Sequence, residues 1–243
     1  MRLIQIAIVT SVPSVIETLI KDSILKKAID KKVLNLKLLN LRDYGIGKYK
    51  QIDDTPFGGG GGMVLMPEPL FDAIDDAMTW MKEKEDISVI LPSPLGKKWN
   101  QAVAEKFSKK KSIILICGRY KGLDERVIKK YVTDQFSIGD FIMTSGEIPS
   151  MIFLDSIVRL VPGALNNLDS VLNDSFSHEL LDYPHYTKPR DFRNTVVPSV
   201  LLGGNHKQID KWRNDHRKKR TINYRPDLWE KYIKKKESEK NNE

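Results

Sequence analysis

Three short glycine-bearing segments have the composition of a small-molecule site. They are LPSPLG (residues 91–96), CGRYKG (117–122) and SIGDFIMTSGE (137–147), and each one follows an apolar, strand-like run and precedes a helix-like one. In open α/β sheets, ligands bind in the crevice beyond the carboxyl ends of the strands. Taken singly, each segment is typical of an ordinary turn, but three of them at one sheet edge favour a binding site.

The chemistry of these three segments limits the class of ligand. They offer many backbone N–H and C=O groups, and few side chains that could hold a metal ion or a phosphate. This composition favours a neutral or zwitterionic ligand such as an adenosine derivative.

A run of five glycines, in FGGGGGMVL (57–65), raises a separate question. Glycine loses more backbone entropy on folding than any other residue, so such a run suggests a backbone that passes close to something else. Glycine-rich loops can cradle phosphates, but the Gly-Lys-Ser/Thr that completes a nucleotide-binding P-loop does not follow. The two interpretations are therefore a close approach to a ligand and a flexible surface loop.

The elements that must position these segments follow from hydrophobic periodicity. We expect strands at 4–9, 33–41, 88–91, 112–117 and 131–138, and helices at 13–29, 67–84, 99–109, 123–130 and 147–160. Thr144 to Glu147 fit a capping box at the start of the last helix. Alternating strands and helices of this kind predict an α/β domain with a mostly parallel sheet.

The last quarter of the chain differs in composition from the rest. Residues 161–175 contain Pro, Gly and Asn and are expected to form a linker, and helices are expected at 205–218 and 226–236. Residues 188–243 hold 16 Lys/Arg and 8 Asp/Glu, which accounts for the whole net charge of +8. This asymmetry favours a polyanionic partner, most often nucleic acid, although a solvated helical surface with a lysine-rich tail is the alternative.

Overall composition excludes several classes of protein. The 243 residues are 40% hydrophobic, so the chain should be globular, and no apolar run is long enough to span a membrane. The N-terminal residues fit a buried strand better than a signal peptide. Cys117 is the only cysteine, which excludes an internal disulfide and a thiolate zinc cluster, and at a strand end it is most simply a buried apolar residue. We expect a cytoplasmic protein.

Eight segments in register carry a family resemblance. They are DDTPFGGGGGMVL, LPSPLGKKWNQ, CGRYKGLDERV, SIGDFIMTSGEIPSM, RLVPG, NDSF, LDYPHYTKP and LLGGNHKQIDKWR, and they span nearly the whole chain in order. In these segments the chain resembles the bacterial tRNA (guanine-N(1)-)-methyltransferases, the TrmD family of the SPOUT methyltransferases.

The resemblance implies a domain organisation that periodicity alone does not show. Residues 1–162 would form a SPOUT-type α/β, parallel-sheet domain with a deep trefoil knot, 163–175 an interdomain linker, and 176–243 a small, basic, helical tRNA-binding domain. The protein would be a homodimer with its active site shared between chains. It would methylate ring nitrogen 1 of the guanosine at position 37 of tRNA, where another guanosine precedes it. The methyl donor would be S-adenosylmethionine, and dependence on Mg²⁺ is also implied, but the sequence offers no octahedral carboxylate site for it.

The resemblance also assigns binding residues. The cofactor would lie on Leu91, Ser93, Pro94, Gly96, Gly118, Tyr120, Gly122, Ser137, Ile138, Gly139, Asp140, Phe141, Ile142, Met143, Gly146 and Pro149. The tRNA would be bound by Gly58, Gly59, His185, Asn205, His206, Lys207, Lys211 and Arg213, with Trp212 as an aromatic platform. The glycine run would line the space between the cofactor and the target base.

The implied reaction requires a base, because ring nitrogen 1 of guanine carries a proton at neutral pH. Asp174, in NDSF, matches the base proposed for the family, and an ordinary aspartate can accept a proton. Arg159, in RLVPG, matches the arginine that would stabilise charge on the guanine carbonyl oxygen. Without the resemblance, Asp174 would be interpreted as a helix N-cap and Arg159 as a surface residue at a helix end. Asp53 and Asp54 are weaker candidates.

Three positions depart from the family pattern and keep other functions open. Lys121 stands where the family usually has an acidic residue, Ser145 and Gly203 also differ, and Asp174 and Arg159 are retained. The alternatives are a related knotted methyltransferase that acts on another RNA, and a non-enzymatic RNA-binding protein with a decayed pocket.

Overall fold

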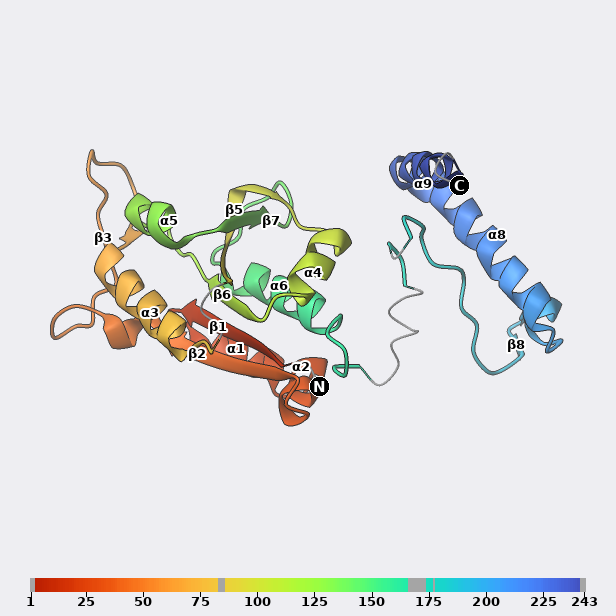
Figure 1. The fold of residues 1–243 in the computed structure, drawn as a ribbon, viewed down its shortest axis with the longest axis horizontal. Coiled ribbons are helices and arrows are strands. Elements are labelled where there is room, and N and C mark those ends of the chain that lie inside the picture. The colour runs from red at the N-terminus through yellow and green to blue at the C-terminus, as the bar shows by residue number, and fades with distance from the viewer. Residues whose placement is uncertain (1–2, 83–85, 166–173, 177, 241–243) are drawn as a thin grey trace. The chain divides into compact units, whose positions relative to one another are not determined.

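The computed structural model describes residues 3–82, 86–165, 174–176 and 178–240, and it forms two compact units. The first unit comprises residues 1–166 and the second residues 167–243 (Figure 1). Of the linker expected at 161–175, residues 166–173 lie outside the described residues.

The first unit is built on a five-stranded parallel sheet, in the order β2-β1-β6-β5-β7. The strands are β1 (Ile4–Thr10), β2 (Leu34–Asn40), β5 (Ile87–Lys98), β6 (Ser112–Ile116) and β7 (Asp134–Ser137). Every residue of β1 and β6 is buried, which agrees with their continuous apolar runs and with a position in the middle of a covered sheet.

Helices cover both faces of this sheet, so the predicted α/β class is confirmed (Figure 1). They are α1 (Pro13–Ile20), α2 (Ile24–Asp30), α3 (Pro67–Trp80), α4 (Gln101–Ser108), α5 (Glu125–Tyr131) and α6 (Glu147–Val158). Alternate residues of β1 point to opposite faces: Ile6 packs into the cluster that includes α1, α2, α4 and α6, and Ala7 into the cluster that includes α3 and α5.

Several predicted boundaries were wrong for local reasons. The helix expected at 13–29 is two helices, because Ser23 Oγ accepts a hydrogen bond from Leu25 N (3.2 Å) and starts α2. The helix expected to reach residue 84 ends at Trp80. The strand expected at 88–91 continues to Lys98 as β5, with a break in its pairing to β7 between Pro92 and Lys97.

The predicted capping box before α6 was also wrong. The helix begins at Glu147 itself, so Glu147 is its first residue and not its third, and Gly146 caps it without a side-chain hydrogen bond. The Glu147 carboxylate instead accepts a hydrogen bond from Thr10 Oγ1 (2.7 Å) in the buried interior.

The glycine run lies in a loop between β3 (Asp53–Asp54) and β4 (Val64–Leu65), which pair in antiparallel fashion. A short 3-10 helix, η1 (Leu41–Tyr44), precedes this part of the chain. Gly58, Gly59, Gly60 and Gly62 have φ of +83°, +78°, +107° and +94°, in the left-handed region that other residues rarely adopt. The backbone conformation therefore strongly favours glycine at these four positions.

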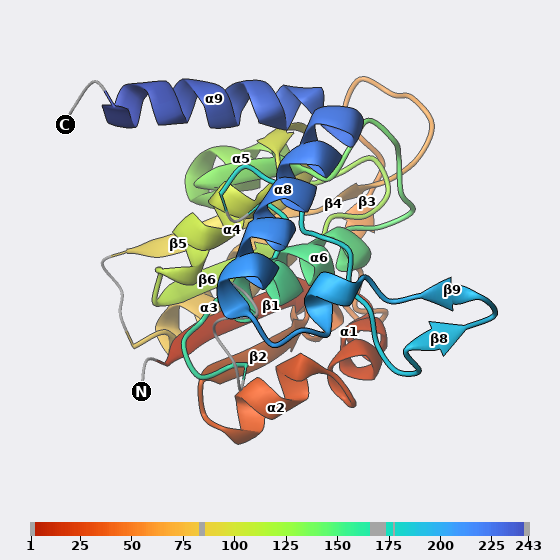
Figure 2. The same cartoon turned by 90° about the vertical axis from the view of Figure 1, so that its right-hand side faces the viewer.

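The second unit contains two long helices and a short hairpin. Its elements are β8 (Asp191–Phe192), β9 (Thr195–Val196), η2 (Ser199–Leu201), α8 (His206–Tyr224) and α9 (Pro226–Lys240) (Figure 2). Asn205 caps α8 by accepting a hydrogen bond from Gln208 N (3.3 Å). Both helices extend beyond the ranges expected from the sequence. Within the described part of the chain, no helix is long and apolar enough to cross a membrane.

Candidate functional site

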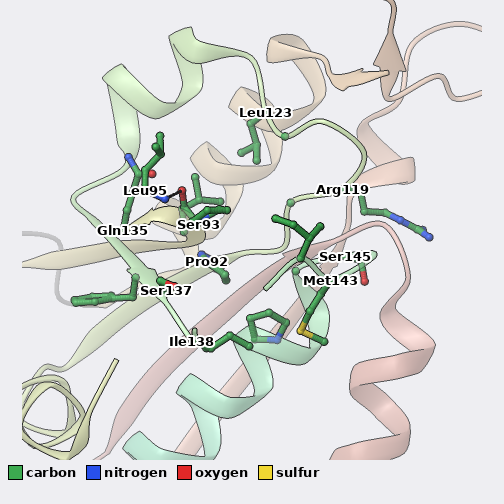
Figure 3. Close-up of a pocket in the computed structure, with 18 of the residues that line it drawn as sticks. Pro92, Ser93, Leu95, Arg119, Leu123, Gln135, Ser137, Ile138, Met143 and Ser145 are labelled. Atoms are coloured by element: carbon green, nitrogen blue, oxygen red, sulfur yellow. Dashed lines mark hydrogen bonds between the residues drawn. The ribbon is translucent and has the colours of Figure 1, made fainter. Parts of the chain in front are cut away.

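A cavity of about 530 Å³ lies at the edge of the sheet where β5, β6 and β7 end their buried runs. Because these strands run parallel, with Ile90 opposite both Leu115 and Asp134, the segments that follow emerge together. The structure thus brings the three glycine-bearing segments to one place. Of the residues predicted to bind the cofactor, the cavity is lined by Leu91, Ser93, Pro94, Gly118, Tyr120, Gly122, Ser137, Ile138, Gly139, Phe141, Ile142, Met143, Gly146 and Pro149 (Figure 3).

Two of the predicted cofactor residues lie outside this lining. A side chain at Gly96 would overlap the backbone of Gln135 and Phe136, so glycine is needed there for packing of β5 on β7. Asp140 is exposed, and its Oδ2 lies 3.7 Å from Lys98 Nζ. Neither Gly96 nor Asp140 therefore lines the cavity.

The second and third loops are joined through their backbones. Gly146 N donates to Gly118 O at 2.7 Å, and Arg119 pairs with Ser145 in an isolated antiparallel bridge. A Cβ on Gly146 would lie 2.6 Å from Gly118 N and 3.0 Å from Cys117 Cα. Glycine at 146 is therefore what allows these two loops to form one continuous wall.

Local hydrogen bonds shape the remaining walls. Ser137 Oγ accepts from Gly139 N and donates to Gly139 O, both at 3.1 Å, which closes a turn at the start of the third loop. Ser93 Oγ accepts from Leu95 N at 3.2 Å in the first loop. The lining is otherwise mainly apolar side chains and backbone groups, as expected of a small-molecule site.

The glycine loop is attached to the rim of the cavity. Lys121 N donates to Met63 O and Leu65 N donates to Gly122 O, both at 3.0 Å. The Lys121 side chain lines the cavity and lies over Gly62, where a Cβ would approach Lys121 Cγ to 3.1 Å. Asp53 and Asp54 form β3 and so fix the other end of the loop, with Asp54 Oδ1 accepting from Thr55 N at 2.7 Å.

Gly61 has no reason within the described chain to be glycine. Its φ lies outside the left-handed region, and no atom would come within 4 Å of a Cβ placed on it. Gly58 and Gly59 also face open space, although their φ angles already favour glycine. The open space beside Gly61 is therefore available to a molecule outside the chain.

A small polar cluster is buried beneath the loops, and the sequence analysis missed its carboxylate. Glu147 is 1% exposed, bonded to Thr10 through Oε1, and its Oε2 has no partner among the described residues. Cys117 is buried as predicted, and its Sγ donates to Ser150 Oγ at 3.4 Å. Burial raises the pKa of the Cys117 thiol to about 12, so it remains protonated and is not a nucleophile. The signal for Glu147 was an acidic residue at the first position of a helix whose residues are mostly apolar.

Arg119 lines the cavity too, and the sequence pointed to it only as part of the second glycine-bearing segment. Its side chain points away from the rest of the lining (Figure 3). Its Nη1 donates a hydrogen bond to Ser11 Oγ at 3.5 Å. Its guanidinium also lies 5.8 Å from the centre of the Tyr120 ring.

The two predicted catalytic residues belong to different units. Arg159 is the half-buried C-cap residue of α6 in the first unit. Asp174 lies in the second unit, where its backbone carbonyl accepts a hydrogen bond from Arg217 Nη2 at 3.5 Å. Ser175 and Phe176, which follow it, form a turn and not a helix, so the N-cap interpretation of Asp174 has no support.

The predicted tRNA-binding residues of the second unit lie at the start of α8 and in the segment before it. Asn205, His206, Lys207 and Lys211 are exposed. Trp212 stacks on His216 with a centroid distance of 4.0 Å, and the Arg213 guanidinium lies 5.0 Å from the Tyr183 ring centre. His185 Nε2 lies 2.8 Å from Asp182 Oδ2, which orients that imidazole.

Comparisons with known proteins agree over nearly the whole chain. The family described as "tRNA (Guanine-1)-methyltransferase TrmD" matches residues 4–231. A tRNA (guanine-N(1)-)-methyltransferase of Staphylococcus epidermidis is 47% identical over 223 residues, which cover 92% of this chain and 89% of that one. The protein of that name from Clostridioides difficile is 45% identical over 224 residues, 92% and 96% of the two chains. That from Listeria monocytogenes is 49% identical over 194 residues, 79% and 78% of the two.

Proposed function

The chain belongs to the family of tRNA (guanine-1)-methyltransferases, and from this premise we propose that its target is the guanosine at position 37 of tRNA. The protein catalyses S-adenosylmethionine-dependent methylation of ring nitrogen 1 of a guanosine in tRNA. The observation that supports binding of the methyl donor is the wall of three loops at one sheet edge, and the position of the target rests on the family. We assign the protein to the cytoplasm, because it modifies tRNA.

The cavity fits the methyl donor. Its volume of about 530 Å³ lies within the range of small-molecule sites, roughly 300–1,000 Å³, and its apolar lining suits an adenine ring. We assign the donor to the three loops, with Ser137, Gly118 and Gly146 contributing backbone and hydroxyl groups. When bound, S-adenosylmethionine supplies an electrophilic methyl group on a sulfonium centre. No group of three or more potential metal ligands occurs among the described residues, so we assign no magnesium site.

The chain's own residues would handle the proton of the target base. In the proposed mechanism, the Asp174 carboxylate accepts the proton that ring nitrogen 1 of guanine loses. The Arg159 guanidinium stabilises the negative charge that develops on the guanine carbonyl oxygen, since its planar donors suit an oxyanion. Both roles rest on the family motif.

We propose that the active unit is a homodimer whose sites combine residues of both chains. Ile148 and Ile152 support this, because they lie one turn apart on α6 and are 41% and 43% exposed, while the other side of the helix is buried in the core. A second copy of the chain would cover them. The hydrogen bond from Gly146 N to Gly118 O joins two loops in the part of the domain where the family resemblance implies a trefoil knot. We include that knot in the proposal.

The position of the target is tested with two tRNA transcripts. One carries guanosine at position 37 and the other carries adenosine there, and transfer of labelled methyl from S-adenosylmethionine is measured on both. We expect transfer to the first transcript alone. Equal transfer to both would show that a different guanosine is the target.

Substitution of Gly61 in the glycine loop should affect stability and activity differently. Gly61→Ala should leave the free energy of unfolding unchanged or raise it by about 0.4–1 kcal/mol, because alanine fits the native φ and restricts the unfolded chain. If tRNA occupies the open space, the same change should lower kcat/KM for tRNA, by up to about 100-fold if a reacting group is displaced by about 1 Å.

Thermal unfolding and steady-state kinetics measure the two effects, with Gly58→Ala as the matched control. That control should lose about 1–2 kcal/mol of stability, because a side chain is strained at a left-handed φ. Normal kinetics for Gly61→Ala would place the tRNA elsewhere.

A further inference from the structure

The hairpin formed by β8 and β9 is an exposed element of the second unit. Every residue from 185 to 196 is exposed, and among them Phe192 and Val196 are 60% and 56% exposed. Figure 2 shows the hairpin projecting away from α8. An aromatic residue on such a projection contributes little to the core, so its contacts must be sought outside the unit.

The hairpin is well ordered by its own geometry. Arg193 and Asn194 have φ of +52° and +64°, the two successive left-handed residues of a two-residue turn that matches the twist of paired strands. Asp191 pairs with Val196 and Phe192 with Thr195. Val197 N donates to Arg190 O at 3.0 Å and closes the base of the hairpin. The backbone that carries Phe192 is therefore held in place by contacts within the hairpin itself.

The charges of the hairpin identify the class of partner. The Arg193 guanidinium lies 5.2 Å from the centre of the Phe192 ring, as in a cation–π pair. Lys188, Arg190 and Arg193 are flanked by one acidic residue, Asp191, and the structure places no carboxylate against any of the three cations within the described residues. An aromatic ring beside unneutralised cations suits a nucleobase and its phosphates, because bases stack on aromatic faces and on guanidinium planes.

We propose that this hairpin is an additional RNA-binding element, in which Phe192 and Arg193 stack on an unpaired base of the tRNA and Lys188 and Arg190 contact its phosphates. The inference rests on the proposed function for the identity of the RNA. It assigns to residues 188–193 an affinity role that is separate from the chemistry at Asp174.

The test separates stacking from charge. Phe192→Ala and Phe192→Leu should each raise the KM for tRNA, by roughly 5- to 150-fold for the loss of one stacked base, while Phe192→Trp should retain wild-type KM. Arg190→Gln removes a cation that is proposed to contact phosphate and keeps the backbone carbonyl that closes the hairpin, so the slope of log K against log salt should become shallower by about 0.7–0.9. Values of kcat at saturating tRNA and the Kd for S-adenosylmethionine should be unchanged.

Lys26→Gln is the charge control, because it removes an exposed cation from the first unit that is already paired with Asp30. It should leave the KM for tRNA unchanged. A wild-type KM for both Phe192→Ala and Phe192→Leu would overturn the proposal. A wild-type KM for Phe192→Leu alone would also overturn it, because it would indicate an apolar contact with protein. A change in the oligomeric state of the Phe192 variants, measured by light scattering, would overturn it as well, because it would indicate that a second copy of the chain binds the hairpin.

Tryptophan fluorescence and methyl transfer provide two further measurements. Binding of tRNA should quench additional tryptophan emission in Phe192→Trp relative to the wild type, and the absence of that difference would also contradict stacking. Methyl transfer by the wild-type protein is measured first. If it transfers no methyl to tRNA, the proposed function fails, whereas the binding titrations still report on the hairpin.

Discussion

Asp174→Asn should lower the rate of methyl transfer by about 10²–10⁴-fold, the usual contribution of a positioned general base. Asparagine keeps the size and shape of aspartate but cannot accept the proton of ring nitrogen 1. The variant should fold, bind S-adenosylmethionine and bind tRNA as the wild type does, because asparagine keeps hydrogen-bonding capacity at this position and a carboxylate gives no attraction to phosphate.

The measurement is a single-turnover rate, since multiple-turnover rates can report product release in place of chemistry. Asp30→Asn is the matched control, because Asp30 is an exposed carboxylate paired with Lys26 and lies outside the cavity lining. It should transfer methyl at close to the wild-type rate. A near-normal rate for Asp174→Asn, with intact binding of both substrates, would remove Asp174 from the mechanism and make Asp53, Asp54 and Asp140 the next bases to test.

The second large effect is expected for Gly146→Ala, which should abolish or strongly weaken binding of S-adenosylmethionine. A Cβ at this position would lie 2.6 Å from Gly118 N and 3.1 Å from Cys117 C, which are backbone atoms that no rotamer change can move. The second and third loops would have to separate, and their 2.7 Å hydrogen bond would be lost. Overpacking of this kind typically costs about 1–3 kcal/mol, which corresponds to roughly 5- to 150-fold in cofactor affinity if the loops absorb it.

Calorimetric titration with S-adenosylmethionine measures this loss, and Gly203→Ala is the control. The nearest atoms to a Cβ at Gly203 are carbonyl oxygens at 3.9 Å and 4.0 Å, and its φ is outside the left-handed region. The control should bind the cofactor normally. Unchanged affinity in Gly146→Ala would mean that the cavity is not the cofactor site.

The two variants together test the proposed dimer. A mixed dimer of one Asp174→Asn chain and one Gly146→Ala chain should regain one working site if Asp174 of one chain acts on guanine beside the cofactor of the other. Verified mixed dimers that show no recovery would indicate that each chain contains a complete site.

Local sequence patterns were sufficient to predict much of the fold. The apolar runs of β1 and β6 indicated strands buried on both faces, and the structure places both in the middle of the sheet. Helical spacing predicted the helices of the first unit, but it missed the break between α1 and α2, where capping by Ser23 took precedence over periodicity. The family itself followed from motifs in order, and the comparisons confirm it.

Contacts between distant segments could not be obtained in this way. Nothing in the local pattern distinguishes Gly96, which packs against β7, from Gly146, which joins two loops of the cavity wall. The pairing of Thr10 with Glu147 spans 137 positions, and only the packing of α6 beneath the end of β1 brings these two residues together.

The sequence by itself determined the chemistry that is available: glycine-rich loops, a candidate base and arginine, and a basic C-terminal region. The tertiary structure decided which of these residues share a surface. The strand order β2-β1-β6-β5-β7 places three loops at one edge, and two left-handed residues project Phe192 from the second unit. The physical reason is that periodicity and turn chemistry act over a few neighbouring residues, whereas strand order and cavity shape depend on which buried surfaces pack together across the whole chain.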